Sequence, residues 1–128
     1  MPFVTLYLKK GSSDDSLKKC MYEITKAGAN TLENTLERMI RVTIIESDEC
    51  RTYNGGKITQ QLQPSVIFRI GPGRSPEAKL SFMNQIADIL SSNLNCCKDD
   101  VRGYILDNVE GHHFCIGGKH KDFSKKVK

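Results

Sequence analysis

The chain has 128 residues and a formal net charge of +4. Residues 119–128 contain five lysines and one aspartate, so this segment carries the whole net charge and the rest of the chain is neutral. A neutral body argues against nucleic-acid binding, which would use a basic face on the folded domain. The longest apolar runs, such as residues 42–45, are too short for a signal peptide or a membrane span. Five cysteines, an odd number without the spacing of a disulfide framework, favour a reducing, cytoplasmic compartment.

The first half of the chain predicts a strand, a helix and a second strand. Residues 3–8 are rich in β-branched and aromatic side chains, which favours a strand. Ser13 is a helix N-cap, and the apolar spacing predicts a buried helix face made of Leu17, Cys20, Met21, Ile24 and Ala27. A second strand is predicted over residues 40–46, and Gly55-Gly56 permits a hairpin or a sharp bend.

The second half predicts the same order of elements. Residues 64–70 form the strand, Ser75 is the N-cap, and Pro76 takes the first helical position. The predicted buried face of this helix consists of Leu80, Met83, Ile86, Ala87, Leu90 and Leu94. The last strand covers residues 101–107 and a second Gly-Gly turn follows at 117–118. Within each β-α-β unit the two strands should be parallel, joined by a right-handed crossover.

The two halves are a tandem repeat. Pro2 returns as Pro64 (64 − 2 = 62), and Gly11 returns as Gly73 (73 − 11 = 62). A unit of about sixty residues is at the low limit of what buries a core alone. We therefore predict one domain over residues 2–118, built from repeats 2–62 and 64–118, and a basic tail over residues 119–128 to which we assign no role.

The two prolines differ chemically. Removal of Met1 would give Pro2 a free secondary amine, whereas Pro64 stays in a tertiary amide that has no proton to exchange. A free α-amine has a reference pKa of about 8, and burial and neighbouring arginines both lower it towards neutral pH. Pro2 is therefore the candidate general base.

The residues that surround these prolines resemble the 4-oxalocrotonate tautomerase family. The matching segments are an N-terminal Met-Pro, Gly73-Arg74-Ser75 before a helix, Val101-Arg102 at the start of a strand, and residues 111–118 with one extra residue at His113. The resemblance covers Pro2 to about Lys119, and two such units in one chain are similar to the fused branches of the superfamily. It implies an α+β fold, with a four-stranded sheet backed by two antiparallel helices on one face, in a homotrimer with one proline site per chain.

Three arginines are candidates for substrate binding. Arg74 stands just before a helix N-terminus, where its guanidinium and unpaired backbone donors could hold a carboxylate. Its counterpart in the first repeat is Ser12. The first repeat thus has the proline that can act as a base but no arginine here, and the second has the arginine but no such proline. Pro2 is therefore expected to face Arg74. Arg41 and Arg102 both match the family's second-strand arginine, and either could join them. Arg69 is interpreted as a surface residue.

The resemblance also implies a pocket-closing aromatic residue at Phe114, and Tyr53 is the alternative because the extra histidine shifts the register. His112 and His113 lack partners with ligand spacing, so we predict no metal and no cofactor.

The resemblance implies a tautomerase that interconverts enol and keto, or conjugated and unconjugated, forms of a small 2-oxo carboxylate. The alternatives within the superfamily are a 3-haloacrylate dehalogenase or hydratase, a 3-oxo acid decarboxylase, and a non-enzymatic binding protein like its cytokine relatives. The hydrating and decarboxylating enzymes need an extra carboxylate near the proline, and neither repeat has an obvious inward acid on a strand. We predict a small carboxylate substrate, and no nucleic-acid or membrane partner.

Overall fold

A computed structural model describes residues 2–59, 61–107 and 115–120. The first repeat contains β1 (Phe3–Lys9), α1 (Asp14–Thr31), a short 3₁₀ helix η1 (Glu37–Met39) and β2 (Arg41–Ser47). The second contains β5 (Ser65–Ile70), α2 (Pro76–Asn93), η2 (Lys98–Asp100) and β6 (Arg102–Asp107). The expected β-α-β order is confirmed in both halves.

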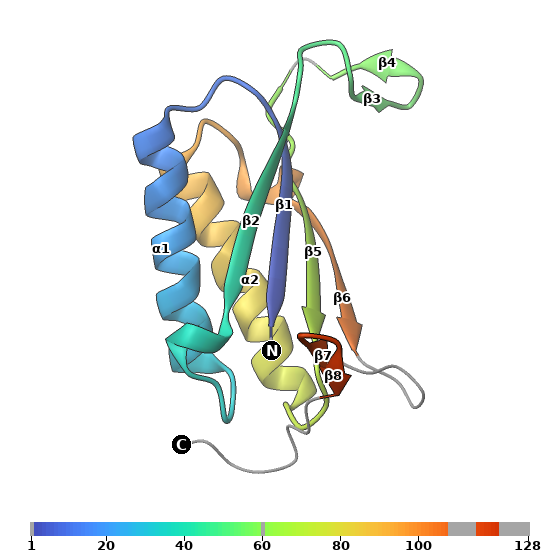
Figure 1. The fold of residues 1–128 in the computed structure, drawn as a ribbon. Helices are drawn as coiled ribbons and strands as arrows, with labels where there is room; N and C mark the ends of the chain where they lie inside the picture. Colours follow the sequence, from blue (N-terminus) through green and yellow to red (C-terminus); the bar gives the residue numbers. More distant parts are fainter. Residues whose placement is uncertain (1, 60, 108–114, 121–128) are drawn as a thin grey trace.

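Four strands form one mixed sheet in the order β2-β1-β5-β6. β1 is parallel to β2 and β5 is parallel to β6, as expected within each unit, whereas β1 and β5 pair antiparallel at the centre. Both helices cover the same face of this sheet (Figure 1). The helices are antiparallel, because Gln85 donates to Thr31 at one end of their contact and Asn93 donates to Glu23 at the other. The expected sheet and helix layer are therefore confirmed.

Both helices begin where the sequence predicts. The side chain of Ser13 accepts from Ser16 N at 3.1 Å, and that of Ser75 accepts from Ala78 N at 3.2 Å. Each serine satisfies a backbone donor that the first helical turn leaves without an intrahelical acceptor. Pro76 occupies the first turn of α2 as expected.

The core lies between the helices and the central strands. Alternate residues of β1 and β5 point into it, and their pattern is typical of a sheet covered on one side. These fully or almost fully buried residues are Val4, Leu6, Leu8, Val66, Phe68 and Ile70. At Gly28 a Cβ atom would lie 2.8 Å from the side chain of Ile40 and 3.0 Å from that of Phe82, so a larger residue there would force these side chains to move.

The predicted buried face of α1 is largely confirmed, but that of α2 is wrong in one part. Leu80 is 63% exposed, whereas Phe82 is fully buried. Phe82 packs edge to face on Phe68 with ring centroids 5.0 Å apart, so the largest side chain of the helix sets which face turns inward. Ile86 and Leu90 then follow at intervals of four residues and are buried as predicted.

A small hairpin lies near the end of each repeat. β3 (Tyr53–Asn54) pairs with β4 (Lys57–Ile58), and β7 (Cys115–Ile116) pairs with β8 (Lys119–His120). The glycines of both turns have positive φ, which a two-residue hairpin turn of this kind requires at both positions. The permitted hairpins are thus formed. The second one extends through His120, and residues 121–128 of the predicted tail lie outside the described residues.

Candidate active site

Pro2 and Pro64 occupy equivalent positions at opposite ends of the sheet. Both prolines are fully buried. The carbonyl of Pro2 accepts from Arg41 N at 3.0 Å, and the carbonyl of Pro64 accepts from Arg102 N at the same distance. Because β1 and β5 run antiparallel, the start of one strand lies beside the end of the other. Pro2 and Arg41 are therefore at one end of the sheet, and Pro64 and Arg102 are at the other.

Arg74 belongs to the end that carries Pro2. Phe3 pairs with Arg69, so the next residue outward, Pro2, lies opposite Ile70 at the end of β5. Arg74 follows four residues later (74 − 70 = 4), just before the first turn of α2. The sheet topology thus puts the proline of the first copy and the arginine of the second at the same end of the sheet.

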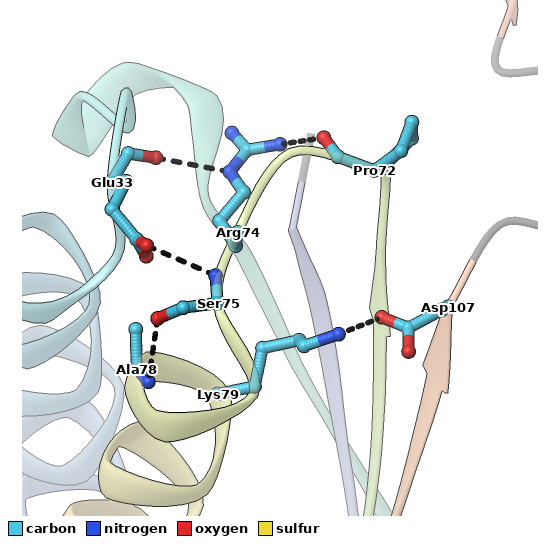
Figure 2. Close-up of polar contacts among 7 residues, drawn as sticks. All are labelled: Glu33, Pro72, Arg74, Ser75, Ala78, Lys79 and Asp107. Atoms are coloured by element: carbon cyan, nitrogen blue, oxygen red, sulfur yellow. Dashed lines mark hydrogen bonds and ion pairs between the residues drawn. The ribbon is translucent and has the colours of Figure 1, made fainter.

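The Arg74 side chain is buried and makes several hydrogen bonds with the connection between α1 and η1. It is 7% exposed. Its Nε donates to the carbonyl of Glu33 at 3.0 Å, and its Nη2 donates to the carbonyl of Asn34 at 3.2 Å and to the hydroxyl of Thr35 at 3.0 Å. Its Nη1 makes a longer contact, 3.5 Å, with the carbonyl of Pro72 (Figure 2). Of the three guanidinium nitrogens, Nη1 thus makes the longest and weakest hydrogen bond.

The burial of Arg74 has an electrostatic consequence. Removal from water lowers the pKa of the Arg74 guanidinium, and the nearby carboxylate of Glu33 raises it. The group stays charged, because the arginine guanidinium is not deprotonated in proteins. A buried permanent cation at this end of the sheet attracts an anion.

Glu33 supplies one such anion. Its Oε2 accepts from Ser75 N at 2.9 Å, at the N-terminus of α2 (Figure 2). Hydrogen bonds from backbone N–H groups of Glu33 itself and then of Ser75 lower the pKa of this carboxyl group. The N-terminus of α2 was predicted to help bind an external carboxylate, and in this structure a carboxylate of the chain occupies its first backbone donor.

The other two arginines are exposed and lie at different ends. The guanidinium of Arg41 is 5.4 Å from the ring centre of Phe3, at the Pro2 end. Arg102 donates through Nη1 to the carbonyl of Asp99, at the Pro64 end. Of these two arginines, Arg41 is the one that lies at the Pro2 end of its own chain. Arg69 is exposed on β5, as interpreted from the sequence.

Of the two candidate aromatic residues, only Tyr53 is among the described residues, and it is not at the Pro2 end. Phe114 lies outside the described residues, as do His112 and His113. Tyr53 is exposed on β3, which follows the end of β2 that is farthest from Pro2.

Sequence reasoning missed two residues of this site, Glu33 and Thr35. Both lie in the connection between α1 and η1, where five residues (32–36) stand in place of the four (94–97) of the other repeat. The extra residue is visible as a change in the repeat offset, from 62 before this connection to 61 after it (102 − 41 = 61). That change was the available signal that the two ends of the sheet differ here.

Over residues 2–59, 61–107 and 115–120, no group of three or more His, Cys, Asp or Glu side chains is arranged to hold a metal ion. None of the helices in those ranges has the length and apolar character to cross a membrane.

Comparison with known proteins identifies the fold. No protein-family model matches the sequence, and no curated protein matches it significantly. Among solved structures, native fused 4-OT (4-oxalocrotonate tautomerase) has a TM-score of 0.82 and 20% identity, covering 92% of this chain and 94% of that one. A fused 4-OT solved as an asymmetric trimer has a TM-score of 0.81 and 22% identity, with the same coverage.

A third structure extends the comparison to a ligand-treated protein. Pt0534 inactivated by 2-oxo-3-pentynoate has a TM-score of 0.82 and 17% identity, covering 92% of this chain and 95% of that one. The near-complete coverage in both directions includes both repeats. The chain therefore has the fold of the fused, two-copy 4-oxalocrotonate tautomerases.

Proposed function

We propose that the chain is a cytoplasmic, cofactor-independent tautomerase that interconverts the enol and keto forms of a small 2-oxo acid. Pro2, freed by removal of Met1, acts first as general base and then as general acid. The observation that carries the proposal is the antiparallel pairing of β1 and β5, which brings Pro2 to the end of the sheet that carries Arg74. Neither repeat alone combines an N-terminal proline with this arginine.

The proposed chemistry follows from the properties of a buried secondary amine. With its pKa lowered towards neutrality, the Pro2 nitrogen is neutral in an appreciable fraction of chains and can remove a proton alpha to the carbonyl. It then returns a proton to the 2-oxo oxygen or to a remote carbon, so the reaction needs no other reactant. The rigid ring fixes the direction of the nitrogen, which favours transfer to one position.

The arginines have separate roles in this proposal. The Nη1 edge of Arg74 holds the substrate carboxylate, because this edge has only the long contact to Pro72. Arg41 or Arg102 polarises the 2-oxo oxygen or a second carboxylate. Arg41 can do so within the chain, whereas Arg102 must come from another chain, because it lies at the Pro64 end. Phe114 closes the pocket.

The mature N-terminus tests this proposal directly. We expect the rate of ketonisation of phenylenolpyruvate to rise in proportion to the fraction of chains that begin at Pro2, because a retained Met1 converts the amine into an amide. Intact-mass spectrometry measures that fraction, and an ultraviolet assay measures the rate on the same preparations. Full turnover by chains that all retain Met1 would exclude Pro2 as the base.

We also propose that the chain forms a homotrimer, as the fused 4-OT structures do. The sheet face opposite the helices carries large apolar side chains, among them Tyr7, Ile45, Leu106 and Tyr104, the last of which is 71% exposed. β2 and β6 are the edge strands of the sheet, and three chains around an axis can cover both the edges and this face.

Native mass spectrometry provides the measurement. We expect the mass of three chains at micromolar concentration, and we expect Tyr104→Lys to shift the population to monomer because it places a charge on the covered face. Leu80→Lys, an equally exposed leucine on α2, is the matched control and should stay trimeric. A monomeric parent chain would contradict this assembly.

A further inference from the structure

The two ends of the sheet differ by one pair of charged side chains. At the Pro2 end, Arg74 is buried against the connection after α1, and Glu33 accepts from the N-cap residue of α2. The equivalent positions at the Pro64 end are Ser12 (74 − 62 = 12) and Asn95 (33 + 62 = 95). The Pro64 end therefore has neither the large cation nor the carboxylate that occupy the Pro2 end.

The chain segment facing Ser12 is also smaller. Residues 94–97 connect α2 to η2, whereas residues 32–36 connect α1 to η1. At the Pro2 end, Arg74 and its acceptors fill the space before the helix. At the Pro64 end the connection is shorter and the side chain at position 12 is small, so a cavity remains.

This cavity, called here the Ser12 cavity, has a volume of about 520 Å³. That volume lies within the usual range of small-molecule sites. Its lining residues are Lys9, Lys10, Gly11, Ser12, Gln61, Leu62, Asn95, Cys96, Cys97 and Asp100. Most of these side chains are polar, so the cavity is suited to a polar ligand.

The positive and negative side chains that line the Ser12 cavity come from different elements of the fold. Lys9 and Lys10 both come from the β1 side, and Lys10 also forms an exposed ion pair with Asp48 at 2.7 Å. Asp100 comes from η2 and is the acidic residue among those that line the cavity. A ligand that presents a carboxylate towards the lysines and a hydrogen-bond donor towards Asp100 matches both sides.

A second polar group is available beside this cavity. A smaller cavity of about 170 Å³ shares Lys9 and Gln61 with it and is also lined by Thr59. Thr59 is 8% exposed, and among the described residues its hydroxyl oxygen has no hydrogen-bond partner. A buried hydroxyl without a partner is costly, and a polar ligand that reaches past Lys9 would remove that cost.

We propose that the Ser12 cavity is a second small-molecule site, separate from Pro2, that binds a small hydroxycarboxylate without transforming it. The carboxylate takes the place that the Glu33 carboxylate has at the Pro2 end, and the hydroxyl group bonds to Asp100. No reaction follows, because Pro64 is held in an amide and has no proton to transfer. This site goes beyond the proposed tautomerase and does not depend on it.

L-Malate is the probe, and ¹H–¹⁵N NMR titration of the full chain is the measurement. We expect saturable shifts at Ser12, Gln61 and Asn95 with a Kd on the order of 1 mM, which suits a ligand of this size. The uncharged diamide of malate should give no saturable shifts there, because it lacks the carboxylates that the lysines attract. Equal shifts with the diamide, or no saturable shift with malate, would overturn the proposal.

Position 95 gives a matched pair of variants on an exposed residue. Asn95→Glu introduces the carboxylate that Glu33 provides at the other end, and it should weaken malate binding by about tenfold or more through repulsion and competition. Asn95→Gln keeps the position neutral and should bind within about twofold of the parent chain. Unchanged malate affinity in Asn95→Glu would also refute the site. Turnover at Pro2 should be the same in both variants, so failure of the proposed tautomerase is a separate result.

Discussion

Replacing Pro2 by alanine should lower the rate of keto–enol interconversion by about 10²- to 10⁴-fold, the range for loss of a positioned general base. Some activity should remain, because alanine leaves a primary amine of similar basicity at the same chain end but with looser geometry. Steady-state kinetics with phenylenolpyruvate or 2-hydroxymuconate measures the effect, after mass spectrometry has shown that Met1 is removed from both proteins.

Pro64→Ala is the internal control for this experiment. Pro64 is buried to the same extent as Pro2 and accepts an equivalent hydrogen bond from a strand arginine, so both substitutions disturb the packing similarly. Only Pro2 can have a free amine, and Pro64→Ala should therefore change turnover little. Equal losses of activity in the two variants would point to a folding defect and remove the argument for the terminal amine.

Replacing Arg74 by alanine should reduce kcat/KM by about 2 to 4 kcal/mol and raise KM strongly. The substitution removes the charged partner of the substrate carboxylate. It also leaves the carbonyls of Glu33 and Asn34 and the hydroxyl of Thr35 without their donor, so the free energy of unfolding should fall by about 1 to 3 kcal/mol. Kinetics should be measured at a temperature where circular dichroism shows that the variant is folded.

Two further variants separate the binding role of Arg74 from its structural one. Arg69→Ala removes an exposed strand arginine at the same end and should leave kinetics unchanged. Ser12→Arg in the Arg74→Ala background should not restore activity, because position 12 lies at the Pro64 end. If Arg69→Ala damages kinetics while Arg74→Ala does not, the carboxylate is bound on the strand instead of before α2. If neither matters in a trimer with a free Pro2, a binding protein becomes the better interpretation.

The order of elements follows from the sequence for local reasons. Ser13 and Ser75 are good N-caps, Pro76 suits a first helical turn, and the Gly-Gly pairs suit tight hairpins. The repeat offset then predicted two equal β-α-β units, and their pairing into one sheet followed from the need to bury both helices. These features depend on short-range chemistry and on comparison of the chain with itself.

The side of α2 that is buried could not be predicted from such local features. The apolar periodicity of α2 is compatible with an inward Leu80, and only the position of Phe68 on the neighbouring strand decides that Phe82 is buried instead. When a helix has apolar residues on several sides, its sequence does not determine which side is buried. The shape of the surface against which the helix packs determines it.

The sequence determined that the second repeat carries an arginine where the first has serine. Tertiary structure decided what surrounds that arginine, because its acceptors lie in a connection some forty residues earlier in the chain. It also decided that Arg41 and not Arg102 shares an end with Pro2, since antiparallel pairing of the central strands sends equivalent residues to opposite ends. The tertiary structure also produces the Ser12 cavity, because the two small segments that leave this space, at Ser12 and after α2, are far apart in the sequence.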